Sequence, residues 1–69
     1  MIIKIVAAAV LLTGVVDQIN DDSATIEYKL GDKVFYTTVS VSNSDCIPRE
    51  GDRVKFITDD KIYSCEGKK

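Results

Sequence analysis

The chain has 69 residues and a mass of 7.6 kDa, which allows one domain, because a chain of this size buries only about 60% of the surface that it exposes when unfolded. An apolar share of 45% and a charged share of 29% place it among globular proteins and exclude disordered and collagen-like classes. The net charge is −2 and no histidine is present, so a strong field for polyanions and the commonest proton-transfer side chain are both missing.

The opening residues form an apolar segment. Residues 5–16 carry no charge and follow Lys4. As a helix these twelve residues would span about 18 Å, short of the ~30 Å hydrocarbon core of a membrane. As a strand they are apolar on both faces, which fits a doubly covered strand or a contact between protomers. We expect the segment to be the first strand of the fold; the alternatives are an export signal or short anchor over residues 1–16 and a buried helix.

Four further strands are predicted, each bounded by Asn, Asp or Gly residues that favour turns. They are residues 24–30, 33–41, 53–58 and 61–65. In the first of these, apolar residues alternate with polar ones, as in a half-buried strand, and Leu30 belongs to the apolar face. Gly31-Asp32 predicts a two-residue hairpin turn, after which Phe35 points inward and Tyr36 outward. Residues 42–50 form the longest irregular segment, with room for a single helical turn.

Five short strands without an amphipathic helix predict an all-β fold. We expect a small five-stranded antiparallel barrel in which residues 1–69 form a single domain and the N-terminal apolar segment is the first strand. Closure is expected because an open sheet of five strands leaves its edges and one apolar face uncovered.

Several motifs resemble the oligonucleotide- and oligosaccharide-binding (OB) barrel. They are Gly14-Val-Val-Asp-Gln-Ile19, an acidic turn, Ala24-Thr-Ile-Glu-Tyr28, Gly31, and Ile47-x-x-x-Gly51-Asp-x-Val-Lys-Phe56. Their order is similar to that in S1-type domains and bacterial translation initiation factor one, over most of residues 14–65. An SH3-like barrel is the alternative. The resemblance implies that single-stranded nucleic acid lies across the second and third strands, where Lys29 and Tyr36 suit the task and Glu27 opposes it.

A second candidate binding patch lies on the last two predicted strands. If they pair across Asp59-Asp60, then Arg53, Lys55 and Lys61 come close together, and Tyr63 joins them. The complete candidate binding face is Lys29, Tyr36, Arg53, Lys55, Lys61 and Tyr63. The alternative is that these are ordinary solvated residues that pair with nearby carboxylates.

Cys46 and Cys65 are the only cysteines, with eighteen residues between them. Two thiols without histidine cannot supply the four ligands of a zinc site, so no metal and no cofactor are expected. A disulfide would stabilise the fold by about 3 kcal/mol, a large fraction of what so small a core provides. The alternative is two unpaired thiols, packed as small apolar side chains in a reducing compartment.

The residues favour a binding module over an enzyme. No catalytic residues are expected, because the nearest charge to Cys46 is Asp45, which opposes thiolate formation, and the paired aspartates fall in solvated turns. A protein partner or a homo-oligomer is the favoured ligand. Single-stranded nucleic acid is one alternative. The other is an exported or membrane-tethered domain with a disulfide, in which membrane contact is restricted to residues 1–16. A cytoplasmic location is slightly favoured over an exported one.

Overall fold

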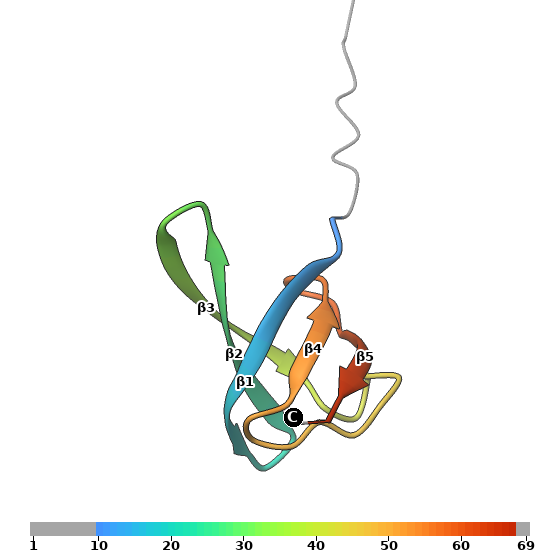
Figure 1. Cartoon of the computed structure of the whole chain (residues 1–69). Helices are drawn as coiled ribbons and strands as arrows, with labels where there is room; N and C mark the ends of the chain where they lie inside the picture. Colours follow the sequence, from blue (N-terminus) through green and yellow to red (C-terminus); the bar gives the residue numbers. More distant parts are fainter. Residues whose placement is uncertain (1–9, 68–69) are drawn as a thin grey trace, which may run out of the picture.

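A computed structural model describes residues 10–67 of the chain, and in this part the protein is all-β (Figure 1). The five strands are β1 (Leu12–Asn20), β2 (Ser23–Leu30), β3 (Lys33–Ser40), β4 (Arg53–Phe56) and β5 (Ile62–Glu66). They form one antiparallel sheet in the order β3-β2-β1-β4-β5. The prediction of a small all-β fold with five antiparallel strands is therefore confirmed.

The central strand β1 pairs with β2 on one side and with β4 on the other. Its pairing with β2 begins at Gly14, opposite Tyr28, whereas Leu12 and Thr13 pair only with β4. Gly14 permits this crossing, because a Cβ atom there would lie 2.6 Å from Cγ2 of Ile26 and 2.7 Å from the main-chain oxygen of Glu27. The glycine thus marks the point at which β1 separates from β2 and continues along β4.

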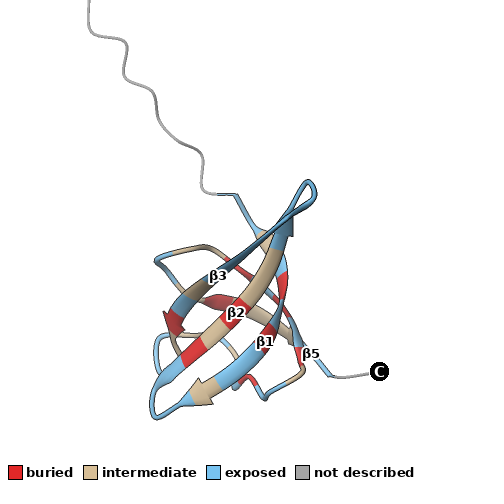
Figure 2. Ribbon diagram, turned by 90° about the vertical axis from the view of Figure 1, so that its left-hand side faces the viewer, coloured by how far each residue is buried: buried red, intermediate tan, exposed pale blue. Residues whose placement is uncertain are grey.

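The core lies in the body of the strongly bent sheet, away from the projecting β2–β3 hairpin (Figure 2). Its members come from every strand and occupy the apolar positions of the predicted alternation. They are Val16, Ala24, Ile26, Val39, Val54, Phe56 and Ile62. Phe56 is fully buried and meets the ring of Tyr28 edge-on, with centroids 5.3 Å apart. The inward side chains of both halves of the sheet therefore pack against one another in a single cluster.

The predicted turns are confirmed. The β1–β2 and β2–β3 hairpins have two-residue turns, Asp21-Asp22 and Gly31-Asp32, since Asn20 pairs with Ser23 and Leu30 with Lys33. Gly31 has a φ of 66°, a value that glycine adopts without steric penalty. Aspartate also tolerates this region, as Asp59 does in the β4–β5 turn with a φ of 64°.

The sheet is not closed by strand pairing in the described residues, because β3 and β5 are its two edges. The segment Val41–Cys46 spans the gap between them instead. The main-chain N–H of Asp45 donates to the carbonyl of Ile62 at 2.9 Å, and the N–H of Ile62 donates to the hydroxyl of Ser44 at 3.0 Å. The expected closure of the barrel by its strands is therefore not found in this part of the chain, and a loop bridges the two edges.

Other details of the sequence prediction need correction. Residues 42–50 contain no helical turn, and the last two strands are shorter or shifted by one residue. Only part of the apolar N-terminal segment can be assessed: residues 12–16 lie in β1, as expected, residues 10 and 11 are not in a strand, and residues 1–9 lie outside the described residues. β1 also continues beyond the segment to Asn20. Within β1, Val16 is buried and Val15 is exposed, so this part of the strand is not covered on both sides.

Candidate binding surface

The β2–β3 hairpin projects beyond the body of the domain (Figure 1). All eight residues of its outer part, residues 29–36, are exposed, and the β2 side of this part lies beyond the β1–β2 pairing, which begins at Tyr28. We call these residues the arm. Its large apolar side chains are Leu30, Val34, Phe35 and Tyr36. The arm therefore presents apolar side chains to solvent on both faces of a two-stranded ribbon.

Aromatic stacking fixes the base of the arm. The rings of Tyr28 and Phe35, which are directly opposite each other on β2 and β3, stack with centroids 5.7 Å apart. Tyr28 in turn contacts Phe56 of the core. Phe35 therefore points inward, as predicted, but it remains 39% exposed because the body of the domain does not reach that far. This chain of three rings connects the arm to the core.

A row of side chains crosses the outer face of the sheet at the base of the arm and includes the last arm residue. In register from β3 to β5 it consists of Tyr36, Glu27, Val15, Arg53 and Glu66. The hydroxyl of Tyr36 donates to the carboxylate of Glu27 at 2.9 Å, and this bond raises the pKa of Tyr36. Glu27, whose charge disfavours binding of nucleic acid, thus also engages the hydroxyl of Tyr36, the only aromatic residue in the row.

A shallow hollow of about 370 Å³ lies beside this row. It is lined by Thr13, Gly14, Val15, Glu27, Tyr28, Lys29 and Arg53. Lys29 and Arg53 approach it from β2 and β4. Lys55, opposite Thr13, is exposed next to it. Four of the six predicted face residues, Lys29, Tyr36, Arg53 and Lys55, are therefore on the outer side of the sheet.

The other two predicted residues belong to a separate cluster at the β4–β5 turn. The strands do pair across Asp59-Asp60, but the ammonium group of Lys61 forms a salt bridge with Asp45 at 2.9 Å. The hydroxyl of Tyr63 donates to Asp60, and Lys61 lies 5.0 Å from the centre of the Tyr63 ring. The hydrogen bond with Asp45 raises the pKa of Lys61, and the hydrogen bond to Asp60 raises the pKa of Tyr63. The cluster holds the loop after β3 against the start of β5.

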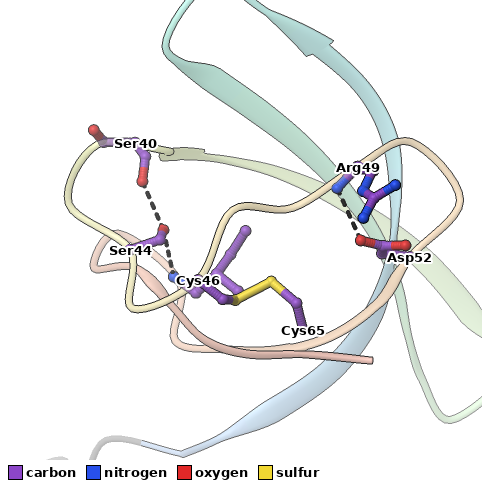
Figure 3. The surroundings of a disulfide bond; sticks show 7 residues. Ser40, Ser44, Cys46, Arg49, Asp52 and Cys65 are labelled. Carbon is purple, nitrogen blue, oxygen red and sulfur yellow. Dashed lines mark hydrogen bonds between the residues drawn. A yellow bond between two sulfur atoms is a disulfide. The ribbon is translucent and has the colours of Figure 1, made fainter. Parts of the chain in front are cut away.

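The cysteines lie at the same edge of the sheet and are joined in a disulfide (Figure 3). Their Cα atoms are 6.0 Å apart, and the bond connects the loop after β3 to β5. Beside it, the hydroxyl of Ser44 accepts the main-chain N–H of Ile62 and donates to the carbonyl of Ser40 at 2.8 Å. The disulfide, this hydroxyl and the Lys61 salt bridge therefore secure one and the same junction.

Asp22 organises the beginning of that loop from the opposite side. Its carboxylate accepts the main-chain N–H of Ser42 at 2.8 Å and the hydroxyls of Ser40 and Ser42 at 2.9 and 2.8 Å. Donation from these groups, the Ser42 hydroxyl first, lowers the pKa of Asp22. The β1–β2 turn therefore carries an ionised, well-anchored carboxylate where β3 ends.

Sequence reasoning missed the exposure of the arm. It placed Leu30 and Phe35 on the inward face, where the alternation puts them, but it gave no sign that β1 leaves β2 at Gly14. Leu30 is 50% exposed as a result. The available signal was the run of three large apolar residues just after the turn, where Val34, Phe35 and Tyr36 follow one another.

Residues 10–67 contain no helix that could cross a bilayer and no group of three or more cysteine, aspartate or glutamate side chains placed to hold a metal ion. No protein-family model, curated protein or solved structure matches the chain.

Proposed function

We propose that this chain is a non-catalytic binding module that contacts protein, including a second copy of itself, through the arm. The observation that carries the proposal is the exposure of four large apolar side chains on eight consecutive residues. Isolated exposed apolar residues are common on protein surfaces, but a contiguous group is typical of an interaction site. Two of the four are aromatic, a type enriched in protein interfaces.

The alternatives within the molecule are weaker as contact sites. Ile47 is the most exposed large apolar residue, at 83%, but it stands apart in the loop after β3. The Lys61 and Tyr63 cluster has its polar groups engaged within the chain. Burial of a half-exposed Leu, Val or Phe side chain contributes about 1 kcal/mol, so the four arm residues together supply enough for a reversible contact.

Light scattering after size exclusion tests this proposal, with the protein loaded over a wide concentration range. We expect the mass of the unmodified chain to rise toward that of a dimer. The double variant Leu30→Ser/Val34→Ser should remain monomeric, whereas the matched control Ile47→Ser should behave like the unmodified chain. A monomer at every concentration, or equal loss of association in the control, contradicts the proposal.

A second candidate function is binding of single-stranded nucleic acid by an OB-type barrel. The strand order, with β1 shared between β2 and β4, is compatible with a partly open five-stranded barrel of this kind. Lys29, Tyr36, Arg53 and Lys55 on one side of the sheet support it, and Glu27 bonded to Tyr36 weakens it. Titration of labelled oligonucleotides at low salt decides the matter: this function requires binding that weakens with added salt and with Arg53→Ala.

The disulfide favours an oxidising compartment as the place where the module works. Such bonds persist outside reducing compartments, and this one secures the junction that the described residues form between the edges of the sheet. The proposal of an exported domain therefore gains support over the cytoplasmic expectation. Intact-mass measurement on protein from its native cell tests it: two missing hydrogens support export, and two free thiols contradict it.

A further inference from the structure

The edge strand β3 carries main-chain groups that point away from the sheet. Leu30 and Lys33 flank a two-residue turn and so form a hydrogen-bonded pair, and such pairs alternate along an antiparallel ladder. Phe35, Thr37 and Val39 therefore bond to β2 through their main chain. The main-chain groups of the residues between them are directed outward. These residues are Val34, Tyr36 and Thr38.

This edge lacks the features by which proteins usually prevent edge pairing. Those features are short length, proline, bulges and inward or edge charges. β3 has eight residues, pairs with β2 without a shift in register and contains no proline, and its one charged residue, Lys33, is at the turn. Its sequence is rich in β-branched and aromatic residues, which favour strand pairing. A further strand can thus add to the sheet here without any rearrangement.

We infer that β3 pairs antiparallel with β3 of a second copy, so that two five-stranded sheets join into one across a twofold axis. This inference deepens the proposed function and rests on it. In such a twofold pair the outer faces of the two sheets lie on the same side. Side chains on the outer face of one β3 therefore lie opposite side chains on the outer face of the other. The edge is therefore complementary to itself.

Charge also favours a second copy. In the antiparallel pair, the arm of one protomer, with Lys29 and Lys33, approaches the end of the other β3, where Asp21 and Asp22 form the adjacent turn. The two Lys33 side chains lie at opposite ends of the joint and do not repel one another. Apolar arm side chains that are solvated in the single chain, such as Val34 and Tyr36, are brought against the partner strand.

The other edge explains why pairing stops at two copies. At the opposite end of the sheet, the free edge of β5 is covered by the loop Val41–Cys46. The hydrogen bonds of Asp45 and Ser44 and the disulfide hold this loop in place. A dimer joined at β3 therefore exposes only β5 edges, which accept no further strand. The association is closed, and fibres are not expected.

Amide hydrogen exchange followed by NMR tests the inference on the unmodified chain. In dilute solution the amides of Phe35, Thr37 and Val39 should be protected and those of Val34, Tyr36 and Thr38 should exchange fast. At concentrations where light scattering detects dimer, the second group should slow at least tenfold. If a dimer forms and these three amides stay fast, the inference fails and the proposed function stands; if no dimer forms, both fail.

Variants at Thr38 provide an independent test. Thr38→Pro removes an outward N–H without removing a bond to β2, and we expect it to weaken dimerisation at least tenfold. Thr38→Ala, which keeps the N–H, is the matched control and should dimerise nearly as the unmodified chain does. Circular dichroism confirms that each variant is folded. If the proline variant dimerises as strongly as the unmodified chain, strand pairing is contradicted. If the proline variant does not fold, the hydrogen-exchange experiment on the unmodified chain is the test.

Discussion

The strand β5 has five residues and its pairing with β4 shifts in register between Lys55 and Phe56, whereas β3 has eight residues and pairs with β2 without a shift. At β5 a loop, a salt bridge and a disulfide cover the edge. At β3 the described residues provide no such cover before the final residue, Ser40, whose carbonyl accepts from Ser44, and the apolar arm extends from this edge. One sheet thus has a closed edge and an open edge, which divides its residues into those that maintain the fold and those that are free to bind.

The comparison teaches where a very small protein places its stabilising bonds. A chain of this size has a small core, so covalent closure of one edge contributes a large share of its stability. That closure allows the opposite hairpin to leave the core and expose Leu30, Val34, Phe35 and Tyr36. We therefore expect changes at the β5 edge to alter stability and not association, and changes at the arm to alter association more than stability.

Removal of the disulfide should have the largest effect. The double variant Cys46→Ser/Cys65→Ser frees a loop between residues 19 apart, and we expect the free energy of unfolding to fall by about 3 kcal/mol. Urea unfolding measures this. The variant, where still folded, should dimerise as the unmodified chain does; a loss of association at equal fraction folded would contradict the division between the two edges.

The second prediction concerns the crossing point that allows the arm to leave the sheet. Gly14→Ala places a methyl group against the Ile26 side chain and, at 2.7 Å, against the rigid main-chain oxygen of Glu27. Since that oxygen belongs to the β1–β2 ladder, the strands must separate, and we expect a loss of about 1–3 kcal/mol in thermal or urea unfolding. Gly67→Ala is the control, because nothing lies within 4 Å of a Cβ atom there. An unchanged stability of Gly14→Ala would show that β1 does not need the glycine to cross.

The sequence was sufficient for the local features of this fold and insufficient for its edges. Alternation identified Ala24, Ile26, Val54 and Phe56 as inward, and the Asn, Asp and Gly clusters identified the turns, because both signals depend only on neighbouring residues. The separation of β1 from β2 depends instead on the close contacts at Gly14, which are made by side chains 12 and 42 residues away in the chain, Ile26 and Phe56. Single-sequence patterns contain no record of such distances.

The same limit applies to the binding face. Lys29, Tyr36, Arg53 and Lys55 could be placed on the outer side from alternation alone. The engagement of Lys61 by Asp45 could not, because these residues come from segments whose contact requires the loop to cross the gap between β3 and β5. The cysteine pair was undecided for this reason as well: only the fold brings the two residues within bonding range.

A third prediction tests the connection between the arm and the core. Phe35→Ala removes a ring that stacks on Tyr28 but is partly exposed, so we expect a loss of only about 1 kcal/mol in the free energy of unfolding. Because the ring also holds the arm in position, self-association should weaken. Phe35→Leu, which keeps apolar volume, should restore most of the stability. A large loss of stability without any change in association would place Phe35 in the core rather than in the binding surface.

The smallest effect is expected from acid titration of Asp22. Its pKa is lowered from the usual 3.8 by hydrogen bonds from Ser42 and Ser40, so the folded protein holds this carboxylate ionised more strongly than the unfolded chain does. The resulting contribution to stability is present above pH 3.8 and is lost as the pH falls through the lower, folded pKa. In Asp22→Asn that part of the acid-induced loss should disappear, as measured by urea unfolding at a series of acidic pH values. Asp21→Asn is the matched control in the same turn, because asparagine tolerates the φ of 52° that Asp21 adopts. If both variants titrate like the unmodified chain, the Asp22 hydrogen bonds contribute nothing to the attachment of the loop that closes the β5 edge.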